Sequence, residues 1–269
     1  MHMLSPSKDG RGAVTGRPTA LVFFDFDNTI IHGDAGPAFG AYVFRQRLGT
    51  RKGLWGRAGL YLRYTPFATS MGVQSGLYKL GARRRSSIVR SAYRGLRGAP
   101  ADEFYQLMDA FVDEEVPGMV YPEMVDVLRQ HQEMGRRCVI VTTGMEPLVR
   151  RALKHIAPAV DLIGCRLEER DGRLTGRVKG PLFGVDKANI MDAYARPLGI
   201  GLRDCWAYSD HVSDLAMLEA VGHPVVVGAR GRLRRIAQRR GWPVLDPKPP
   251  AGHYPGTRRA ASARAAKGP

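Results

Sequence analysis

Hydrophobic runs rich in β-branched and aromatic residues recur along the chain, each bounded by turn residues. Such runs predict buried β-strands. Between most of them lie segments whose apolar residues repeat at helical spacing. This alternation predicts an α/β fold, with a parallel sheet that carries helices on both faces. The predicted strands are "ALVFFDF", "RCVIVTT", "DLIGC", "CWAYSD" and "PVVVG".

Local sequence signals predict two further elements, a helix and a β-hairpin. A helix is predicted over "YPEMVDVLRQHQEMG", because Pro122 suits a first helical turn and Gly135 suits a helix end. The dipeptide Asp171-Gly172 separates two alternating runs. A β-hairpin is therefore expected there.

The domain organisation follows from where strand patterning stops. Residues 34–118 show helical rather than strand spacing and are predicted to form a separate helical cap domain. The core is then discontinuous, over residues 19–33 and 119–246. Residues 1–18 are expected to be a flexible N-terminus, and residues 247–269, rich in Pro, Gly, Ala and Arg, a disordered basic tail.

The composition is typical of a folded protein. Its 269 residues are 44% hydrophobic, enough for one sizeable α/β domain and a smaller insertion. Three cysteines, an odd number in or beside apolar runs, favour buried reduced thiols over a disulfide framework. No window offers about 18 uninterrupted apolar residues and no secretory signal is visible, so a cytoplasmic protein is expected.

The net charge is +16, and its distribution is uneven. From Arg45 to Arg97 the chain has many Arg and Lys residues and no Asp or Glu, and a second basic cluster lies near residue 269. Such a surface favours anionic partners without identifying them.

Candidate chemistry begins at the end of the first predicted strand. Asp25 and Asp27 stand two residues apart, so on a strand both would project from one face into the crevice where open α/β sheets bind ligands. Two close carboxylates repel each other unless a cation or a shared proton relieves them. Mg²⁺, bound through one or two carboxylates and several waters, would do so.

Three further features fall at the ends of later strands. Thr142 precedes a helix-like segment, where free backbone N–H groups can bind an anion. Lys187 lies close to a helix start and suits a phosphate oxygen. Asp210 ends another strand, and Asp214 follows one helical turn later. Together with the first pair, these residues predict a metal-assisted phosphoryl-transfer site.

In order and spacing, "DFDNT", Thr142, Lys187 and "SDHVSD" resemble the four motifs of the haloacid dehalogenase (HAD) superfamily. The match runs from about residue 21 to residue 246. The helical segment after the first motif and the hairpin before the lysine resemble the phosphoserine-phosphatase-like subfamily IB. The resemblance implies a Rossmann-like core with an inserted helical C1-type cap, and a phosphatase that acts on a small phosphorylated substrate.

The resemblance also implies roles for individual residues. Asp25 would be the nucleophile that forms an aspartyl-phosphate. Asp27 would protonate the leaving oxygen and then activate water. Thr142 and Lys187 would hold the phosphoryl oxygens.

The implied cofactor is Mg²⁺. Its ligands would be Asp25, the backbone carbonyl of Asp27, and Asp210. Asp214 would orient the waters of the metal or Lys187.

Simpler interpretations of several residues stay open at this point. Thr142 could merely cap the following helix while Thr143 contacts the phosphate. Asp214 could be a helix N-terminal acid favoured by the helix dipole. Asn28 is expected to serve a turn, and His32 a hinge or packing contact.

The substrate is the least determined part. Phosphoserine phosphatases place a glutamate shortly after the first motif, where this chain offers Asp34 as the only nearby acid. Phosphoserine or another small phosphomonoester therefore both fit. Alternatively, the basic, aromatic stretch within residues 34–118 could contact an anionic membrane and phosphorylated lipids. A nucleic-acid-binding protein with a vestigial site is a further alternative, although no recognition motif for nucleic acid appears.

Overall fold

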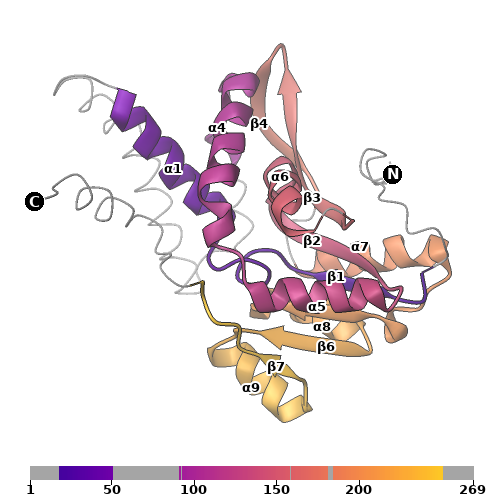
Figure 1. The fold of residues 1–269 in the computed structure, drawn as a ribbon. Coiled ribbons are helices and arrows are strands. Elements are labelled where there is room, and N and C mark those ends of the chain that lie inside the picture. Colours follow the sequence, from indigo (N-terminus) through magenta and orange to yellow (C-terminus); the bar gives the residue numbers. More distant parts are fainter. Residues whose placement is uncertain (1–17, 51–90, 92, 158, 181–183, 251–269) are drawn as a thin grey trace, which may run out of the picture.

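The computed structural model describes residues 18–50, 91, 93–157, 159–180 and 184–250. They build one seven-stranded sheet in the order β4-β3-β2-β1-β5-β6-β7 (Figure 1). Neighbouring strands run parallel except for the antiparallel pair β3 and β4. The strands are β1 (Leu21–Phe24), β2 (Arg137–Met145), β3 (Asp161–Arg170), β4 (Arg173–Lys179), β5 (Trp206–Ser209), β6 (His223–Val227) and β7 (Val244–Leu245).

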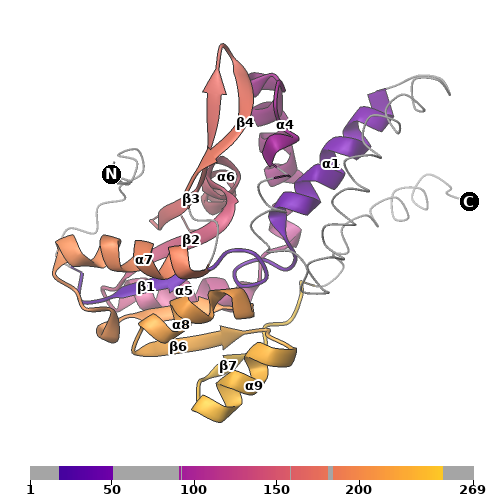
Figure 2. The ribbon, with the colours of Figure 1, turned by 180° about the vertical axis from the view of Figure 1, so that it is seen from behind.

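Helices cover both faces of the sheet. In β1, Val22 and Phe24 point into a core shared with α5 and α6, whereas Leu21 and Phe23 point into a core shared with α7, α8 and α9. Figure 2, seen from behind, brings α7 and α8 to the front. The α-helices are α1 (Ala35–Thr50), α4 (Ala101–Glu114), α5 (Pro122–Glu133), α6 (Glu146–Ile156), α7 (Gly184–Ala195), α8 (Leu215–Ala220) and α9 (Gly231–Arg240). Short 3₁₀ turns occupy Val116–Gly118, Arg196–Leu198, Leu202–Asp204 and Val212–Asp214.

The predicted fold class is confirmed, and so are the five strand positions and the hairpin. Asp171 and Gly172 have φ values of 51° and 66°, the positive pair that a two-residue hairpin turn requires. The predicted helix begins at Pro122, and Gly135 follows its end with φ 71°.

Between β1 and α5 the chain contributes α1 and α4, which extend beyond one end of the sheet, with α4 beside the β3–β4 hairpin (Figure 1). Backbone hydrogen bonds tie the start of α4 to that hairpin, from Gly98 N to Leu174 O (2.8 Å) and from Ala101 N to Gly172 O (2.9 Å). Much of the predicted cap, residues 51–90 and 92, lies outside the described residues, as do residues 1–17 and 251–269 of the two predicted flexible ends.

Two expectations from composition can be compared with the described residues. Cys138, Cys165 and Cys205 are all buried thiols outside any disulfide bond, as expected. Within the described part of the chain, no helix combines the length and the apolar character that crossing a membrane demands.

One buried polar contact fastens α5 to the sheet. His131 on α5 is 6% exposed, and its Nε2 lies 2.8 Å from the Tyr208 hydroxyl on β5. Its Nδ1 lies 2.9 Å from a guanidinium nitrogen of Arg136, which can only donate. The neutral imidazole therefore accepts at Nδ1 and donates Nε2–H to Tyr208. Burial, aided by the charge of Arg136, lowers the pKa of His131 to about 4.

This shift makes stability depend on pH. An unfolded histidine titrates near 6.5, so between about pH 6.5 and 4 the unfolded chain binds more protons than the folded one. The contribution of neutral, buried His131 to the free energy of unfolding is fully present above about pH 6.5. It is lost as the pH falls from about 6.5 toward 4. We expect His131→Gln to reduce the free energy of unfolding at pH 7 by about 1 kcal/mol, and to make its decline between pH 7 and pH 5 shallower.

Urea denaturation at pH 7, 6 and 5 measures both effects. His155→Gln is the matched control, because His155 lies exposed on α6 and pairs with Asp113. Equal declines for wild type and His131→Gln would refute the assignment.

Candidate active site

The carboxyl ends of three neighbouring strands meet at one edge of the sheet. Phe24 in β1 pairs with Ile140 in β2 on one side and with Tyr208 in β5 on the other. The backbone N–H of Asp25 continues this ladder by donating to Tyr208 O (2.9 Å). Asp25 and Asp210 follow the ends of β1 and β5, and Thr142 lies in β2 just past the pairing of Ile140 with Phe24, so the three residues lie at the same edge.

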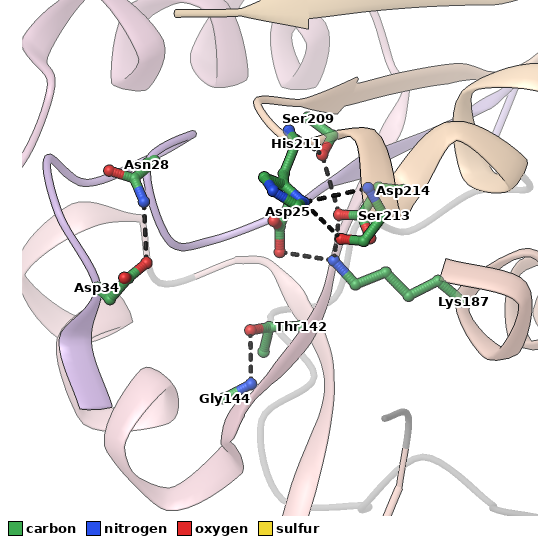
Figure 3. Close-up of polar contacts among 10 residues, drawn as sticks. All are labelled: Asp25, Asn28, Asp34, Thr142, Gly144, Lys187, Ser209, His211, Ser213 and Asp214. Carbon is green, nitrogen blue, oxygen red and sulfur yellow. Dashed lines mark hydrogen bonds and ion pairs between the residues drawn. The ribbon is translucent and has the colours of Figure 1, made fainter. Parts of the chain in front are cut away.

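A buried lysine joins two of the predicted acids (Figure 3). Lys187 reaches from α7 and is 1% exposed. Its Nζ lies 2.8 Å from Asp25 Oδ1 and 2.6 Å from Asp214 Oδ2. The Ser209 hydroxyl donates to the same Asp214 oxygen at 2.9 Å. We call Asp25, Lys187 and Asp214 the ion-pair cluster.

Opposing effects act on the charges of this cluster. Burial raises the pKa of Asp25 to about 6, although the Lys187 ammonium works against that rise. Burial would also raise the pKa of Asp214, but Lys187 and Ser209 hold that pKa below its ordinary value. Burial lowers the pKa of Lys187, and the two carboxylates more than offset this, so Lys187 stays charged.

Asp27 sits beside the cluster in a different environment. Its Oδ1 accepts a hydrogen bond from the backbone N–H of Ala35 at 2.8 Å, at the start of α1. Desolvation nevertheless raises the pKa of Asp27 to about 7, and Asp25 and Asp34 add to the rise. A carboxyl group with this pKa is present in both protonation states near neutral pH.

The turn after β1 sets the position of Asp27. Asn28 has φ 54°, its side-chain oxygen accepts from Gly33 N (3.0 Å), and its amide donates to Asp34 Oδ1 (2.9 Å). The predicted turn role of Asn28 agrees with these contacts. His32 Nδ1 lies 2.9 Å from the Tyr121 hydroxyl, where the chain leaves the core for the inserted segment and returns from it.

Thr142 does not cap a helix, so that interpretation is wrong. The strand β2 continues to Met145, and α6 begins only at Glu146, without a side-chain cap. In the structure, β2 runs past the polar residues, and its register against β3 shifts between Val141 and Met145. The sequence prediction therefore ended this strand too early. Thr142 is buried, and its Oγ1 accepts from Gly144 N at 2.9 Å.

Asp214 lies at a helix N-terminus, as its simple interpretation had it, but its contacts go further. It stands at the N-cap position of α8 and makes no side-chain capping bond there. Its carboxylate accepts from Lys187 and Ser209 instead. In the same loop, His211 Nδ1 accepts from Ser213 N at 3.1 Å and so caps the 3₁₀ turn that leads to Asp214.

Three residues at the site were not anticipated from the sequence. Ser209 supports Asp214, and its place directly before Asp210 at a strand end could have indicated it. Gly144 leaves open the space beside Thr142. Tyr93, whose hydroxyl donates to Thr143 O at 3.1 Å, comes from the inserted segment, and no sequence signal marks it.

The donor set suits a hard divalent cation. Asp25 and Asp210 follow adjacent parallel strands and offer carboxylate oxygens, and the backbone carbonyl of Asp27 is a third oxygen. The raised pKa of Asp25 marks a buried carboxylate whose charge Lys187 does not fully offset, which a cation would favour. The described residues hold no group of three or more His, Cys, Asp or Glu side chains placed to bind a metal; Mg²⁺ needs fewer, since it retains several waters.

Comparisons with known proteins agree with this fold. The sequence profile of haloacid dehalogenase-like hydrolases matches residues 22–219. A Mycobacterium tuberculosis protein named "Probable phosphatase" is 31% identical over 87% of this chain and 78% of its own. A phosphoserine phosphatase of the same organism is 28% identical over 85% of this chain and 71% of its own.

A solved structure shares the fold. It is a phosphoserine phosphatase with an analogue of the phospho-aspartyl intermediate, 18% identical, with a TM-score of 0.59 over 86% of this chain and 94% of that chain. The family profile covers most of the chain and spans every residue of the site described above. This protein therefore belongs to the haloacid dehalogenase-like hydrolase family.

Proposed function

We propose that the protein is a Mg²⁺-dependent phosphatase that hydrolyses a small phosphomonoester through an aspartyl-phosphate on Asp25. The observation that carries this proposal is the buried lysine held between Asp25 and Asp214 at the sheet edge. A cation in this place can keep one carboxylate ionised for attack and can bind phosphoryl oxygens as charge moves in the transition state. The phosphatase names of the similar proteins support it.

Asp25 and Asp27 have different roles because their surroundings differ. Asp25 attacks phosphorus through one carboxylate oxygen, while the bond from phosphorus to the leaving oxygen breaks. Asp27, with a pKa of about 7, gives its proton to that leaving oxygen. It then takes a proton from the water that attacks the aspartyl-phosphate, which releases phosphate and regenerates Asp25.

The remaining residues hold the transferred group. The Thr142 hydroxyl and the Lys187 ammonium donate to phosphoryl oxygens. Thr143, the next residue of β2, contributes a further contact to the same group. Asp214 keeps Lys187 in position, and Ser209 keeps Asp214 in position. Mg²⁺, held by Asp25, Asp210 and the carbonyl of Asp27, would supply positive charge opposite the phosphoryl oxygens.

The substrate proposed is a small phosphorylated molecule, with phosphoserine as the first candidate. One similar protein is named as a phosphoserine phosphatase, and Asp34 is an acid close enough to Asp27 to help raise the pKa of that carboxyl group. The basic stretch that suggested a membrane surface, from Arg45 to Arg97, lies largely outside the described residues. A panel of p-nitrophenyl phosphate, L-phosphoserine, sugar phosphates, nucleotides and a lysophosphatidate, assayed for phosphate release, tests the choice.

Replacing the nucleophile should abolish turnover. Asp25→Asn keeps the shape of the side chain but removes the attacking charge, so we expect phosphate release to fall by about 10³-fold or more. Asp126→Asn, an exposed change on α5, serves as the control and should match the wild type. Comparable rates in wild type and Asp25→Asn would reject the mechanism.

Metal removal should be reversible. Chelation with EDTA is expected to stop phosphate release, and added Mg²⁺ should restore it. Because Asp210 offers a metal ligand, Asp210→Asn should raise the Mg²⁺ concentration needed for half-maximal activity by roughly 10-fold or more. A chelated enzyme that keeps its full rate would contradict the cofactor assignment.

A further inference from the structure

Tyr93 belongs to the segment inserted between β1 and β2, yet its hydroxyl reaches the last part of β2, which holds Thr142. Its side chain is buried, at 7% exposure, and the hydroxyl donates to the Thr143 carbonyl at 3.1 Å. Burial raises the pKa of Tyr93 far above its ordinary value, and the neighbouring Cys165 and Asp27 contribute. The hydroxyl therefore stays protonated and acts as a donor.

The peptide unit between Thr143 and Gly144 is hydrogen-bonded at both ends. Its carbonyl oxygen accepts from Tyr93, and its N–H, which belongs to Gly144, donates to Thr142 Oγ1 at 2.9 Å. In a trans peptide the C=O and N–H bonds point in opposite directions. The two hydrogen bonds therefore act from opposite sides and fix the orientation of this one plane.

This arrangement determines what the Thr142 hydroxyl can do. A hydroxyl carries one proton and two lone pairs, and here a lone pair already accepts from Gly144. Its own proton is then directed to another acceptor, which a phosphoryl oxygen would supply. Hydrogen bonds in a chain also strengthen one another, by about 10–30% each, so donation from Tyr93 makes Thr142 a better donor.

Because Gly144 has no side chain, the space beside the Thr142 hydroxyl stays open. A Cβ atom there would stand 3.2 Å from Thr142 Oγ1 and 3.7 Å from Asp27 Oδ2. The space beside Gly144 thus lies between the hydroxyl and the carboxyl proposed to act on the phosphoryl group and on its leaving oxygen. The peptide that Tyr93 holds forms one wall of this space.

We propose that Tyr93 is a positioning residue for phosphoryl transfer: from the inserted segment, its hydroxyl fixes the Thr143–Gly144 peptide so that Thr142 donates to the transferred group. The inference rests on the proposed function and adds a residue to it. It also gives the inserted segment a part in the chemical step, because a contact made by that segment orients a group of the core.

The test compares two tyrosines of the inserted segment. Tyr93→Phe removes only the hydroxyl that bonds Thr143. Tyr105→Phe is the matched control, since its hydroxyl also links the inserted segment to the core, but to Glu169 on β3, away from Thr142. The readouts are kcat, KM, inhibition by vanadate as an analogue of the pentacoordinate phosphoryl group, and Tm.

Removing a donor that contacts a transition state directly costs about 10²- to 10³-fold in kcat, so this indirect donor should account for roughly 10-fold. We expect Tyr93→Phe to lose that factor in kcat and to weaken vanadate inhibition in parallel, with KM nearly unchanged. Tyr105→Phe should retain the wild-type kcat and the wild-type inhibition by vanadate. In a Thr142→Ala background, Tyr93→Phe should cost little more, because the effect passes through Thr142.

Each contrary outcome has a separate meaning. Wild-type kcat and vanadate inhibition in Tyr93→Phe, with Asp25→Asn inactive, would overturn the inference and leave the proposed function standing. A lower kcat accompanied by a lower Tm and unchanged vanadate inhibition would show a merely structural role and would also overturn it. Equal phosphate release by wild type and Asp25→Asn would instead reject the proposed function itself.

Discussion

The structure depends on one buried ammonium group that satisfies two carboxylates. Lys187, Asp25 and Asp214 come from three elements far apart in the sequence, and all three are nearly excluded from solvent. Burying an unpaired charge costs several kcal/mol, so each member requires the others. The cluster carries one more negative charge than positive, which leaves an electrostatic demand for a cation. This imbalance would favour Mg²⁺ at the edge of the sheet, and the ion together with Lys187 would then attract the anionic phosphoryl group.

The parallel sheet makes this cluster attainable. Because β1, β2 and β5 are parallel neighbours, side chains near their carboxyl ends approach one another at one edge of the sheet. The two apolar cores hold the strands from both faces, with α7 delivering Lys187 from one side and the inserted segment delivering Tyr93 from the other. The chemistry therefore lies where the two layers of helices meet the strand ends.

Much of this arrangement can be predicted from sequence, for identifiable physical reasons. Apolar runs bounded by turn residues located the strands, and the position of Asp25 and Asp27 at the end of the first run placed them at the sheet edge. The extent of β2 around Thr142 was missed, because an irregularity in strand pairing leaves no compositional mark. Tyr93 was missed since its contact depends on how the inserted segment packs, and nothing local distinguishes it from other aromatic residues of that segment.

The proposed mechanism requires that Asp25, activated within the ion-pair cluster, carries the phosphoryl group during turnover. The most direct measurement is mass spectrometry of enzyme quenched in acid during turnover of a good substrate, followed by peptide mapping. The account predicts the mass of one added phosphoryl group on the peptide that contains Asp25 in the wild type, and none in Asp25→Asn. Turnover with no phosphorylated peptide, or with the phosphoryl group on another residue, would contradict it.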